Sequence, residues 1–581
     1  MRNLSLAVCC ITLVAAGLLQ AADWRPVTPE ELALKQPKTD PNADAEALFR
    51  DIRIINEQPS FSYARDIRTE YVRLKIFTPR GKGKYSNVEI PYSGETNISG
   101  VEGRTIKPDG TAVELKKDAV FHKTIVKKGG IRVNEVTFAM PDVEPGDIVE
   151  YRWQANLGDV LFRYVPLEVQ SEFPTEQLTF HIKSETGQWV TMPEMHEMEF
   201  HCKIDKWERE ASGFVRITLH NIPGFHEEPY MPPDYSMKQW ILLYYEENGN
   251  AGRNPDKYWK DLGRQIYKNY HARIKVNDDV RGIASKAVAG AASDDEKLAR
   301  LVEYCRKNLK DIRGGQITLK QREQAKQEWN TADILRQQSG TQDDIRLAFI
   351  ALAKAAGFEA RLAEMCRRDV FFFNPSTTSA FFLNSKAVAV KVDGKWKFYD
   401  VTNRAVAPGQ LPWQLQDVSA LVTDSKTPEF VTTPMLTVKE TMIQHGGSFK
   451  LSADGTLEGV AREVLWGNAA SRWRETFGLK NEAEREDALR RQLKQRFADF
   501  DLSNVRFGDS PDTSKPVGVS YHIVVRNYAQ HTGKRIFLIQ AYFESGNAAR
   551  FVDIVRRQPI YFDYPWSESD SVEIQLPDGY H

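Results

Sequence analysis

Apolar and polar residues alternate over the first part of the chain, in short runs that end at turn residues. Residues 71–76 and 148–153 alternate in this way. Residues 107–111 and 143–147 each combine Pro, Asp and Gly, which is typical of tight turns. A period of two predicts strands that bury one face. The region 71–250 is therefore predicted to be an antiparallel β-domain of sandwich type.

The spacing changes after residue 251, where apolar residues recur at every third or fourth position. Residues 258–270, 298–309 and 343–357 fit helices, and Gly357 fits a cap at the end of the last one. Two alternating runs then flank Asp393-Gly394, a pair typical of a two-residue hairpin turn. The region 251–415 is predicted to be an α+β core, with helices first and an antiparallel sheet second.

The last region, 430–581, returns to the β pattern. It is predicted to be a β-rich domain with one inserted helix at residues 481–497, whose many charges indicate a solvated face. Residues 23–70 are predicted to form an N-terminal extension with a helical segment. The predicted fold class is α+β multidomain.

Residues 1–22 are predicted to be a cleaved signal peptide. Arg2 supplies a positive charge, residues 4–19 are apolar, and Ala21-Ala22 precede a polar stretch. Cys9 follows Val8 rather than a small residue, which disfavours lipid attachment. The apolar stretch is shorter than the roughly 20 residues of a spanning helix, and no later stretch is longer, so no transmembrane segment is expected in the mature chain. A periplasmic or secreted location follows.

Composition excludes some classes of partner. Lys and Arg number 78 against 79 Asp and Glu, and the net charge is -1, so no nucleic acid is expected as a partner. Beyond the signal peptide only Cys202, Cys305 and Cys366 remain, too few and too widely spaced for a disulfide framework. The spacing of His196, His201 and Cys202 fits no metal motif, so neither a metal nor a cofactor is expected.

One segment of the central region carries a recognisable motif. Residues 332–344 run from Ala-Asp-Ile-Leu to Gly340-Thr-Gln-Asp-Asp and into a helix that ends at Ala-Ala-Gly357. This resembles bacterial transglutaminase-like domains, in which Gly-Asp-Cys-x-Asp opens the helix. Residues 384–390 and 395–400 are similar to the family's Asn-His-Ala and Trp-x-x-x-Asp strands. The flanking regions resemble uncharacterised β-domains that often bracket such cores in exported bacterial proteins.

The resemblance implies a papain-like fold with a Cys, His and Asp triad, whose cysteine is activated by the helix N-terminus. Carried over by position, the cysteine corresponds to Gln342, the histidine to Ser385 and the aspartate to Asp400. The chain has no histidine from residue 272 to residue 444, so no shift of register restores a Cys and His pair. No catalytic residue of that kind is therefore expected.

We therefore expect a catalytically inactive binding or assembly module for peptide, envelope polymer or another exported protein. Gln342, Ser385 and Asp400 are the candidate cleft residues, and Asp400 is expected to accept hydrogen bonds from backbone amides. Thr341 and Asp344 fit a helix capping box. Two alternatives stay open: a hydrolase or acyl-transfer enzyme with a non-standard site in or near the same cleft, and a structural spacer that presents β-surfaces.

Overall fold

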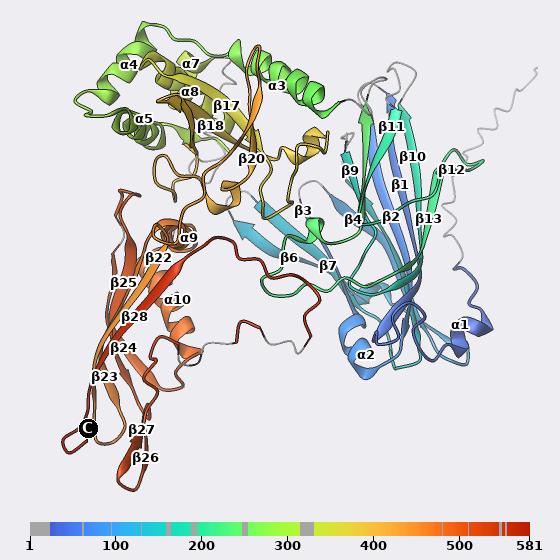
Figure 1. Cartoon of the computed structure of the whole chain (residues 1–581). Helices are drawn as coiled ribbons and strands as arrows, with labels where there is room; N and C mark the ends of the chain where they lie inside the picture. Colours follow the sequence, from blue (N-terminus) through green and yellow to red (C-terminus); the bar gives the residue numbers. More distant parts are fainter. Residues whose placement is uncertain are drawn as a thin grey trace, which may run out of the picture.

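The computed structural model shows three units, two of them rich in strands and one of mixed α and β structure (Figure 1). It describes residues 24–580 except 61–62, 94–95, 129–130, 158–163, 187–193, 247–253, 314–329, 479, 509, 545, 547–548 and 552–554. The predicted signal peptide, with Cys9 and Cys10, lies outside the described residues. Among the helices described, none combines the length and the apolar character needed to cross a membrane.

The N-terminal unit is built on an eight-stranded sheet with the order β12-β13-β10-β1-β2-β8-β4-β5. Its strands are β1 (Ala45–Ser60), β2 (Tyr63–Ile76), β4 (Asn97–Ile106), β5 (Ala112–Glu114), β8 (Ile148–Asn156), β10 (Thr175–Thr186), β12 (Glu208–Arg209) and β13 (Val215–Ile222). Because β1 lies inside the sheet, the predicted boundary at residue 71 is too late. The expectation of an antiparallel domain is also wrong at one place, since β1 and β10 are parallel. A parallel pair needs a long connection, and here several hairpins lie between the two strands.

Two small sheets cover one face of this large sheet and make the unit two-layered. One contains β3 (Asn87–Ser93), β6 (Val120–Lys128) and β7 (Ile131–Ala139), and the other β9 (Tyr164–Glu168), β11 (Glu194–Phe200) and β14 (Trp240–Glu246). Leu74 packs with Phe138 in the first core, and Phe180 packs with Leu243 in the second. The helix α2 (Pro79–Tyr85) lies between β2 and β3.

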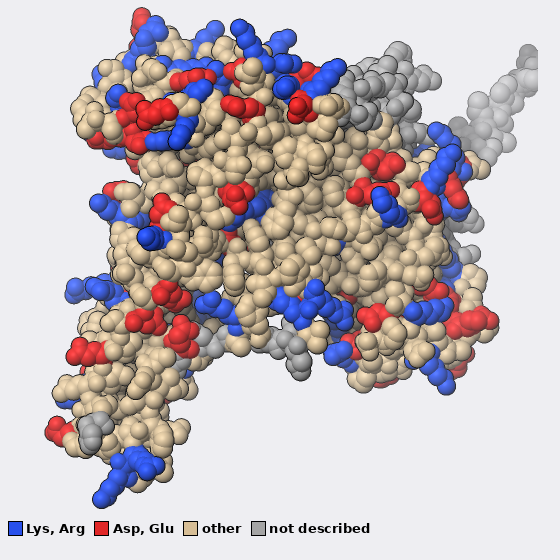
Figure 2. All heavy atoms as spheres, viewed as in Figure 1, with Lys and Arg blue, Asp and Glu red and all other residues tan. Residues whose placement is uncertain are grey.

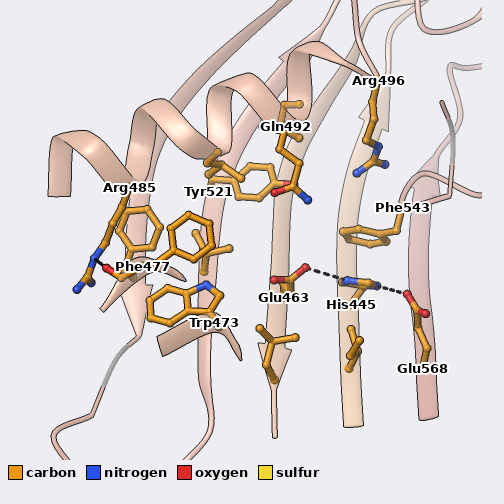
Figure 3. Close-up of a pocket in the computed structure, with 16 residues that line it drawn as sticks. His445, Glu463, Trp473, Phe477, Arg485, Gln492, Arg496, Tyr521, Phe543 and Glu568 are labelled. Carbon is orange, nitrogen blue, oxygen red and sulfur yellow. Dashed lines mark hydrogen bonds and ion pairs between the residues drawn. The ribbon is translucent and has the colours of Figure 1, made fainter. Parts of the chain in front are cut away.

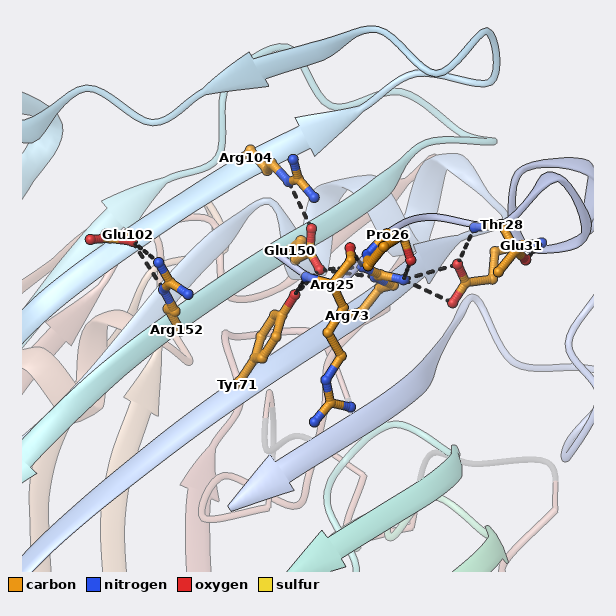
Figure 4. Close-up of polar contacts among 10 residues, drawn as sticks. All are labelled: Arg25, Pro26, Thr28, Glu31, Tyr71, Arg73, Glu102, Arg104, Glu150 and Arg152. Atoms are coloured by element: carbon orange, nitrogen blue, oxygen red, sulfur yellow. Dashed lines mark hydrogen bonds and ion pairs between the residues drawn. The ribbon is translucent and has the colours of Figure 1, made fainter. Parts of the chain in front are cut away.

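The opposite face of the large sheet is covered by the segment that contains α1 (Pro29–Ala33) and carries a buried ion network (Figure 4). Arg73 Nη2 lies 2.7 Å from Glu150 Oε1, and Arg104 Nε lies 2.8 Å from Glu150 Oε2. Glu31 on α1 pairs with Arg73 Nη1 at 2.9 Å. The side chains of Arg73 and Glu150 are 2% and 0% exposed. The two guanidinium groups and two carboxylates therefore balance one another within the protein.

In the residues that the structure describes, the central unit places five helices before a five-stranded antiparallel sheet with the order β19-β18-β17-β20-β21. Its described elements are α3 (Pro255–His271), α4 (Asp278–Val288), α5 (Asp294–Asn308), β15 (Lys310–Asp311), α7 (Thr331–Gln337), β16 (Ser339–Gly340), α8 (Gln342–Ala355), β17 (Glu359–Met365), β18 (Ser385–Val392), β19 (Lys395–Tyr399), β20 (Ser419–Val422) and β21 (Glu429–Thr432). The three predicted helices and the hairpin at Asp393 and Gly394 are confirmed. The sheet continues to Thr432, so the predicted boundary at residue 415 is too early.

The C-terminal unit is a five-stranded sheet covered by two helices. The sheet order is β24-β25-β23-β22-β28, from β22 (Met442–Leu451), β23 (Leu457–Leu465), β24 (Phe500–Gly508), β25 (Val517–Val525) and β28 (Ser567–Gln575). The predicted helix is present as α10 (Glu482–Lys494), and the prediction of a single helix is wrong because α9 (Gly467–Phe477) precedes it. The prediction of a solvated α10 holds for only part of it, because Arg485, Leu489 and Leu493 are buried.

A segment that leads back into β28 joins the three units. It passes from the short hairpin of β26 (Gln530–Thr532) and β27 (Arg535–Phe537) toward the N-terminal unit and returns (Figure 1). The carboxylate of Glu228 accepts hydrogen bonds from the backbone N–H groups of Arg557 and Gln558, at 2.7 and 3.0 Å. Arg368 of the central unit donates to the carbonyl oxygen of Asp563. Residues 555–566, named the strap below, therefore contact all three units.

Candidate functional site

The resemblance assigns the first of its three triad positions to the first turn of α8. Thr341 caps the helix: its hydroxyl accepts from the backbone N–H of Asp344 at 3.2 Å, and Asp344 accepts from the N–H of Thr341 at 2.8 Å. This confirms the predicted capping box. Gly340 is required there, because a Cβ atom at this position would lie 2.7 Å from the Cβ of Asp344. The helix itself is buried along most of its length.

Gln342, at the position of the cysteine, is the first residue of α8 and is engaged in a side-chain contact. Its Nε2 donates a hydrogen bond to Asp311 Oδ2 at 3.1 Å. Asp311 belongs to β15, which pairs with β16 just before the helix. An amide can donate and accept hydrogen bonds but is not a nucleophile. The side chain therefore connects the helix start to β15.

The residue after the histidine position makes the contact between the sheet and the helix. Ser385 begins β18 opposite Met365, and Lys386 follows it opposite Glu364. Lys386 Nζ lies 2.8 Å from Asp343 Oδ2 on α8 and 3.8 Å from Glu364 Oε1 on β17. An ion pair therefore spans the two elements on which the resemblance puts the thiol and the imidazole.

Asp400, the third position, is connected to α8 by hydrogen bonds through Thr402 and Arg346. Its Oδ1 accepts hydrogen bonds from the backbone N–H groups of Thr402 and Asn403, both at 3.1 Å, as predicted. The Thr402 hydroxyl donates to the same Oδ1 at 2.8 Å and accepts from Arg346 Nη2 at 3.2 Å. Arg346 Nη1 in turn lies 2.9 Å from Asp343 Oδ1. Polar contacts thus run continuously from Asp400 to Asp343.

The two carboxyl groups beside Lys386 have pKa values shifted in opposite directions. Partial burial works against ionisation of Asp343, but Lys386 and Arg346 outweigh it and hold the pKa of Asp343 below its usual value. Burial raises the pKa of Glu364, and the nearby charge of Asp343 adds to this effect against the attraction of Lys386. Both positive groups of the site, Lys386 and Arg346, are shared with carboxylates. The arrangement is balanced in charge.

The two buried cysteines of the central unit are poor nucleophiles. Cys305 is 0% exposed inside α5, and Cys366 is 1% exposed after β17. Burial raises the pKa of each thiol to about 12, which keeps the reactive thiolate scarce at neutral pH. The thiol of Cys366 donates instead to the carbonyl oxygen of Phe371 at 3.5 Å.

The histidines and the cysteine considered as metal ligands in the N-terminal unit have other partners. His201 Nε2 contacts the carbonyl oxygen of Ser236 at 2.8 Å, and the thiol of Cys202 donates to that of Trp240 at 3.6 Å. His196 packs its ring on Tyr244. In the part of the chain that the structure describes, the only group of residues spaced to hold a metal ion is His445, Glu568 and Asp570.

A cavity of about 350 Å³ lies where the strap meets the sheet of the C-terminal unit and the loop of the N-terminal unit that contains Tyr230. Its lining comes from Tyr230, Ile443, Arg472, Arg550, Phe562, Asp563, Tyr564, Trp566 and Glu568. On the face shown in Figure 2, positive and negative residues are interspersed, and few of them lie in the middle where the units meet. Aromatic walls with a few polar groups at a domain junction are typical of ligand sites.

The residues that make the polar contacts at this junction were not predicted from the sequence, which pointed only to Gln342, Ser385 and Asp400. Asp343 and Lys386 each lie one residue after a predicted position, and Arg346 lies one turn further along α8. The signal was present in the motif itself, since an acidic residue at the helix start and a lysine at the strand start are complementary. The cavity at the strap could not be found in this way, because its lining comes from segments more than 200 residues apart.

Comparisons with known proteins identify one domain. Residues 64–187, from β2 to the end of β10, match the family described as a domain of unknown function, DUF3857. No curated protein matches the chain. A solved structure from Parabacteroides distasonis, provisionally described as a protease, is 14% identical and covers 85% of this chain and 94% of its own, with a TM-score of 0.44.

Two further solved structures are more distant. A protein from Cytophaga hutchinsonii, provisionally described as a cysteine protease, is 12% identical over 58% of this chain and 88% of its own, with a TM-score of 0.20. An M1 zinc metallopeptidase from Deinococcus radiodurans is 9% identical over 35% of this chain and 43% of its own, with a TM-score of 0.18. Scores this low assign neither a fold nor an activity to this chain.

Proposed function

We propose that the chain is an exported protein whose central unit has lost cysteine-dependent acyl transfer and now serves a binding or assembly role. The ion pair of Lys386 with Asp343 is the observation that carries the proposal. It occupies the junction between α8 and β18, where a thiol and an imidazole would have to meet. The continuous polar contacts from Glu364 to Asp400 support a structural role for that junction.

The ligand we propose is a peptide, an envelope polymer or another exported protein. The aromatic cavity at the strap supports binding, because aromatic side chains contribute large contact areas at interfaces. Tyr230, Tyr564 and Trp566 contribute rings to this lining from two different units. A ligand held there would contact both the N-terminal loop and the strap.

Turnover assays test the loss of chemistry. Wild-type protein and Gln342→Ala are incubated with panels of peptides and peptidoglycan fragments, with an active cysteine peptidase as the positive control. Neither protein is expected to release product. Product formed by the wild type and lost in Gln342→Ala would contradict the proposal.

Binding assays test the role that we propose in its place. Calorimetric titration with the same peptides and fragments is compared for wild type, Trp566→Ala and Phe121→Ala. Trp566→Ala is expected to weaken binding by about tenfold, as for an interface hot spot. Phe121 is exposed on β6 outside the cavity and is the matched control. Binding that depends on Phe121 and not on Trp566 would favour a spacer that presents its β-surfaces.

One observation favours a second candidate, an enzyme that uses acid–base chemistry at the same junction. Asp343 and Glu364 have pKa values shifted apart and are bridged by Lys386, an arrangement that can separate a base from an acid. This candidate predicts turnover that survives Gln342→Ala and is lost in Glu364→Gln. The same substrate panels therefore distinguish it from the first proposal.

A further inference from the structure

A second cavity, of about 260 Å³, lies in the C-terminal unit between the sheet and the helices α9 and α10 (Figure 3). Most of its wall is apolar, with rings from Trp473, Phe477, Phe507, Tyr521 and Phe543. His445, Glu463 and Glu568 form one end of the lining. In Figure 3 these three side chains come from neighbouring strands and point toward one another.

His445 and Glu463 are partly buried on the core-facing side of their strands, whereas Glu568 and Asp570 lie on the same side of β28 but are exposed. On β22 the alternate positions that face the helices include His445 and the buried Phe449 and Leu451. On β23, Glu463 alternates with the buried Ala461 and Leu465. On β28, Glu568 and Asp570 alternate with Val572 and Ile574, which pack on the core. Charges that break a core pattern indicate a functional site more often than a folding device.

Strand register brings these residues into one row. His445 is opposite Glu463 on the antiparallel β23 and opposite Asp570 on the parallel β28. His445 Nδ1 lies 2.8 Å from Asp570 Oδ1 and 3.7 Å from Glu568 Oε1. One ligand atom from each of the three residues lies within 4.8 Å of the others.

These separations suit a small divalent cation. Zn²⁺ binds imidazole nitrogen and carboxylate oxygen at about 2.0–2.2 Å in tetrahedral geometry, which sets neighbouring ligand atoms about 3.3–3.5 Å apart. The two observed separations from His445 Nδ1 lie on either side of that value. The third separation, between the carboxylate oxygens of Glu568 and Asp570, is at most 4.8 Å. Side-chain movements of about 1 Å would therefore bring all three atoms to bonding distance.

The opposite nitrogen of His445 has the partner that metal-binding histidines usually have. Nε2 lies 3.1 Å from Glu463 Oε2, a carboxylate on the side of the ring opposite to the Nδ1 that faces Asp570 and Glu568. The ring also stacks on Phe543, with centroids 4.6 Å apart and planes at 12°. Both contacts hold the orientation of the imidazole.

The charge of the cluster also favours a cation. Glu463, Glu568 and Asp570 surround one imidazole, and the exposed Arg550 lies 3.9 Å from Glu568. The three carboxylates exceed the positive charges even when His445 is protonated. The two arginines in the cavity wall are engaged elsewhere, since Arg485 donates to the carbonyl oxygen of Phe477 and Arg496 to that of Tyr542.

We propose that the C-terminal unit binds one divalent transition-metal ion of the Zn²⁺ type through His445 Nδ1, Glu568 and Asp570. Glu463 orients the imidazole from its other side. Three protein ligands leave a coordination position for water or a ligand, as in open metal sites. The sequence predicted no metal because β28 lies more than 100 residues after β22, and the site forms only when the two strands pair.

Metal titration of the full chain tests this site. After removal of metals with a chelator, Zn²⁺ binding is measured by calorimetry and by equilibrium dialysis, and the ligands by X-ray absorption. One equivalent is expected, with one nitrogen and otherwise oxygen ligands. His445→Ala and Asp570→Asn are each expected to weaken binding at least 100-fold. Glu463→Gln is expected to weaken it by 10–100-fold, as for other partners of metal-binding histidines.

The control uses a second histidine of the same sheet. His522 pairs with Glu458 at 3.4 Å, away from the proposed ligands, and His522→Ala is expected to leave Zn²⁺ binding unchanged. Circular dichroism of each metal-free variant checks that it folds. If His445→Ala does not fold, Glu463→Gln serves as the test, because glutamine retains a hydrogen-bond acceptor for the imidazole. Absence of binding by the wild type, binding that His445→Ala does not weaken, or equal affinity for Ca²⁺ would each overturn the proposal.

Discussion

Charged side chains gather on a sheet in both the N-terminal and the C-terminal unit, but the two groups differ in balance. In the N-terminal unit Arg73 and Arg104 face Glu31 and Glu150, so two positive charges meet two negative charges. In the C-terminal unit one imidazole and an exposed arginine face three carboxylates beside a cavity. A balanced group can be satisfied within the protein, whereas an excess of one charge favours a ligand of the opposite charge.

The junction in the central unit belongs with the balanced group. Lys386 and Arg346 face Asp343 and Glu364, again two positive charges and two negative charges. This is the physical reason for giving that junction a structural role and for placing ligand binding elsewhere. The comparison predicts that removing a charge destabilises the balanced groups and stabilises the unbalanced one.

The largest effect is expected for Arg73→Met. The substitution leaves Glu150, which is fully buried, with Arg104 as its remaining charged partner. Removing one partner of a buried ion pair costs about 3–5 kcal/mol of unfolding free energy. Urea unfolding followed by hydrogen exchange in β2 and β8 measures the loss. Arg80→Met, whose side chain is 79% exposed in its pair with Asp44, is the control and should change stability by at most about 1 kcal/mol.

A second substitution tests Asp66, a buried acidic residue of the N-terminal unit that lies outside the balanced group. Asp66 Oδ1 is buried and accepts no hydrogen bond from the described residues, and burial raises the pKa of Asp66 to about 6. The folded protein therefore keeps this proton at pH values where the unfolded chain, with a pKa of about 3.9, has lost it. Stability from this group is present below about pH 4 and is lost as the pH rises through about 6.

Asp66→Asn is expected to remove that pH dependence and to stabilise the N-terminal unit at pH 7.5 by roughly 1–3 kcal/mol. Unfolding midpoints between pH 4 and pH 8 provide the measurement. Asp118→Asn, at an exposed position of the turn Lys117–Ala119, is the control and should leave the pH profile unchanged. Asn56 Nδ2 donates to the other oxygen of this carboxyl group at 3.3 Å. An unchanged profile for Asp66→Asn would show that this hydrogen bond suffices and that the bound proton does not contribute to stability.

The sequence predicted the parts of this molecule that depend on neighbouring residues. The helix α8, its capping box and the hairpin at Asp393 and Gly394 follow from local spacing and were predicted correctly. The helix α9 was missed because it begins at Gly467 with a φ of +57° and has no capping side chain on Trp466. The position of β1 was missed because a strand reveals its partners only through pairing that is distant in sequence.

The same limit applies to the candidate sites. The triad positions could be carried over from a motif, yet the contacts at the junction come from their neighbours Asp343 and Lys386. His445 and Asp570 are 125 residues apart and meet only because β22 and β28 are parallel neighbours. Contacts of this kind depend on sheet order, which alternation along one strand does not determine.

A smaller effect is expected at the central junction. Lys386→Met removes one positive charge, but Arg346 still pairs with Asp343 and both groups of the lost pair are partly exposed. The loss should be about 0.5–1 kcal/mol, measured by thermal unfolding together with hydrogen exchange in α8. Lys391→Met, on the same strand but beside Trp396, is the matched control. A gain in stability for Lys386→Met would show that this junction resembles the unbalanced cluster of the C-terminal unit, and it would then become a candidate ligand site.

The smallest effect, and the one with the opposite sign, is expected for Glu568→Gln in the metal-free protein. The amide keeps much of the volume of the side chain and removes one of three carboxylates around His445. This relieves repulsion among the carboxylates and costs two long contacts, with His445 at 3.7 Å and with Arg550 at 3.9 Å. Thermal unfolding of the C-terminal unit should show a gain of about 0.5–1 kcal/mol. Glu458→Gln, which removes a carboxylate paired with His522 alone, should give no gain.

With Zn²⁺ present the sign of the effect of Glu568→Gln should reverse, because the variant has lost a ligand and therefore gains less stability from the metal. A loss of stability without metal would mean that the cluster is satisfied within the protein, as the network around Glu150 is.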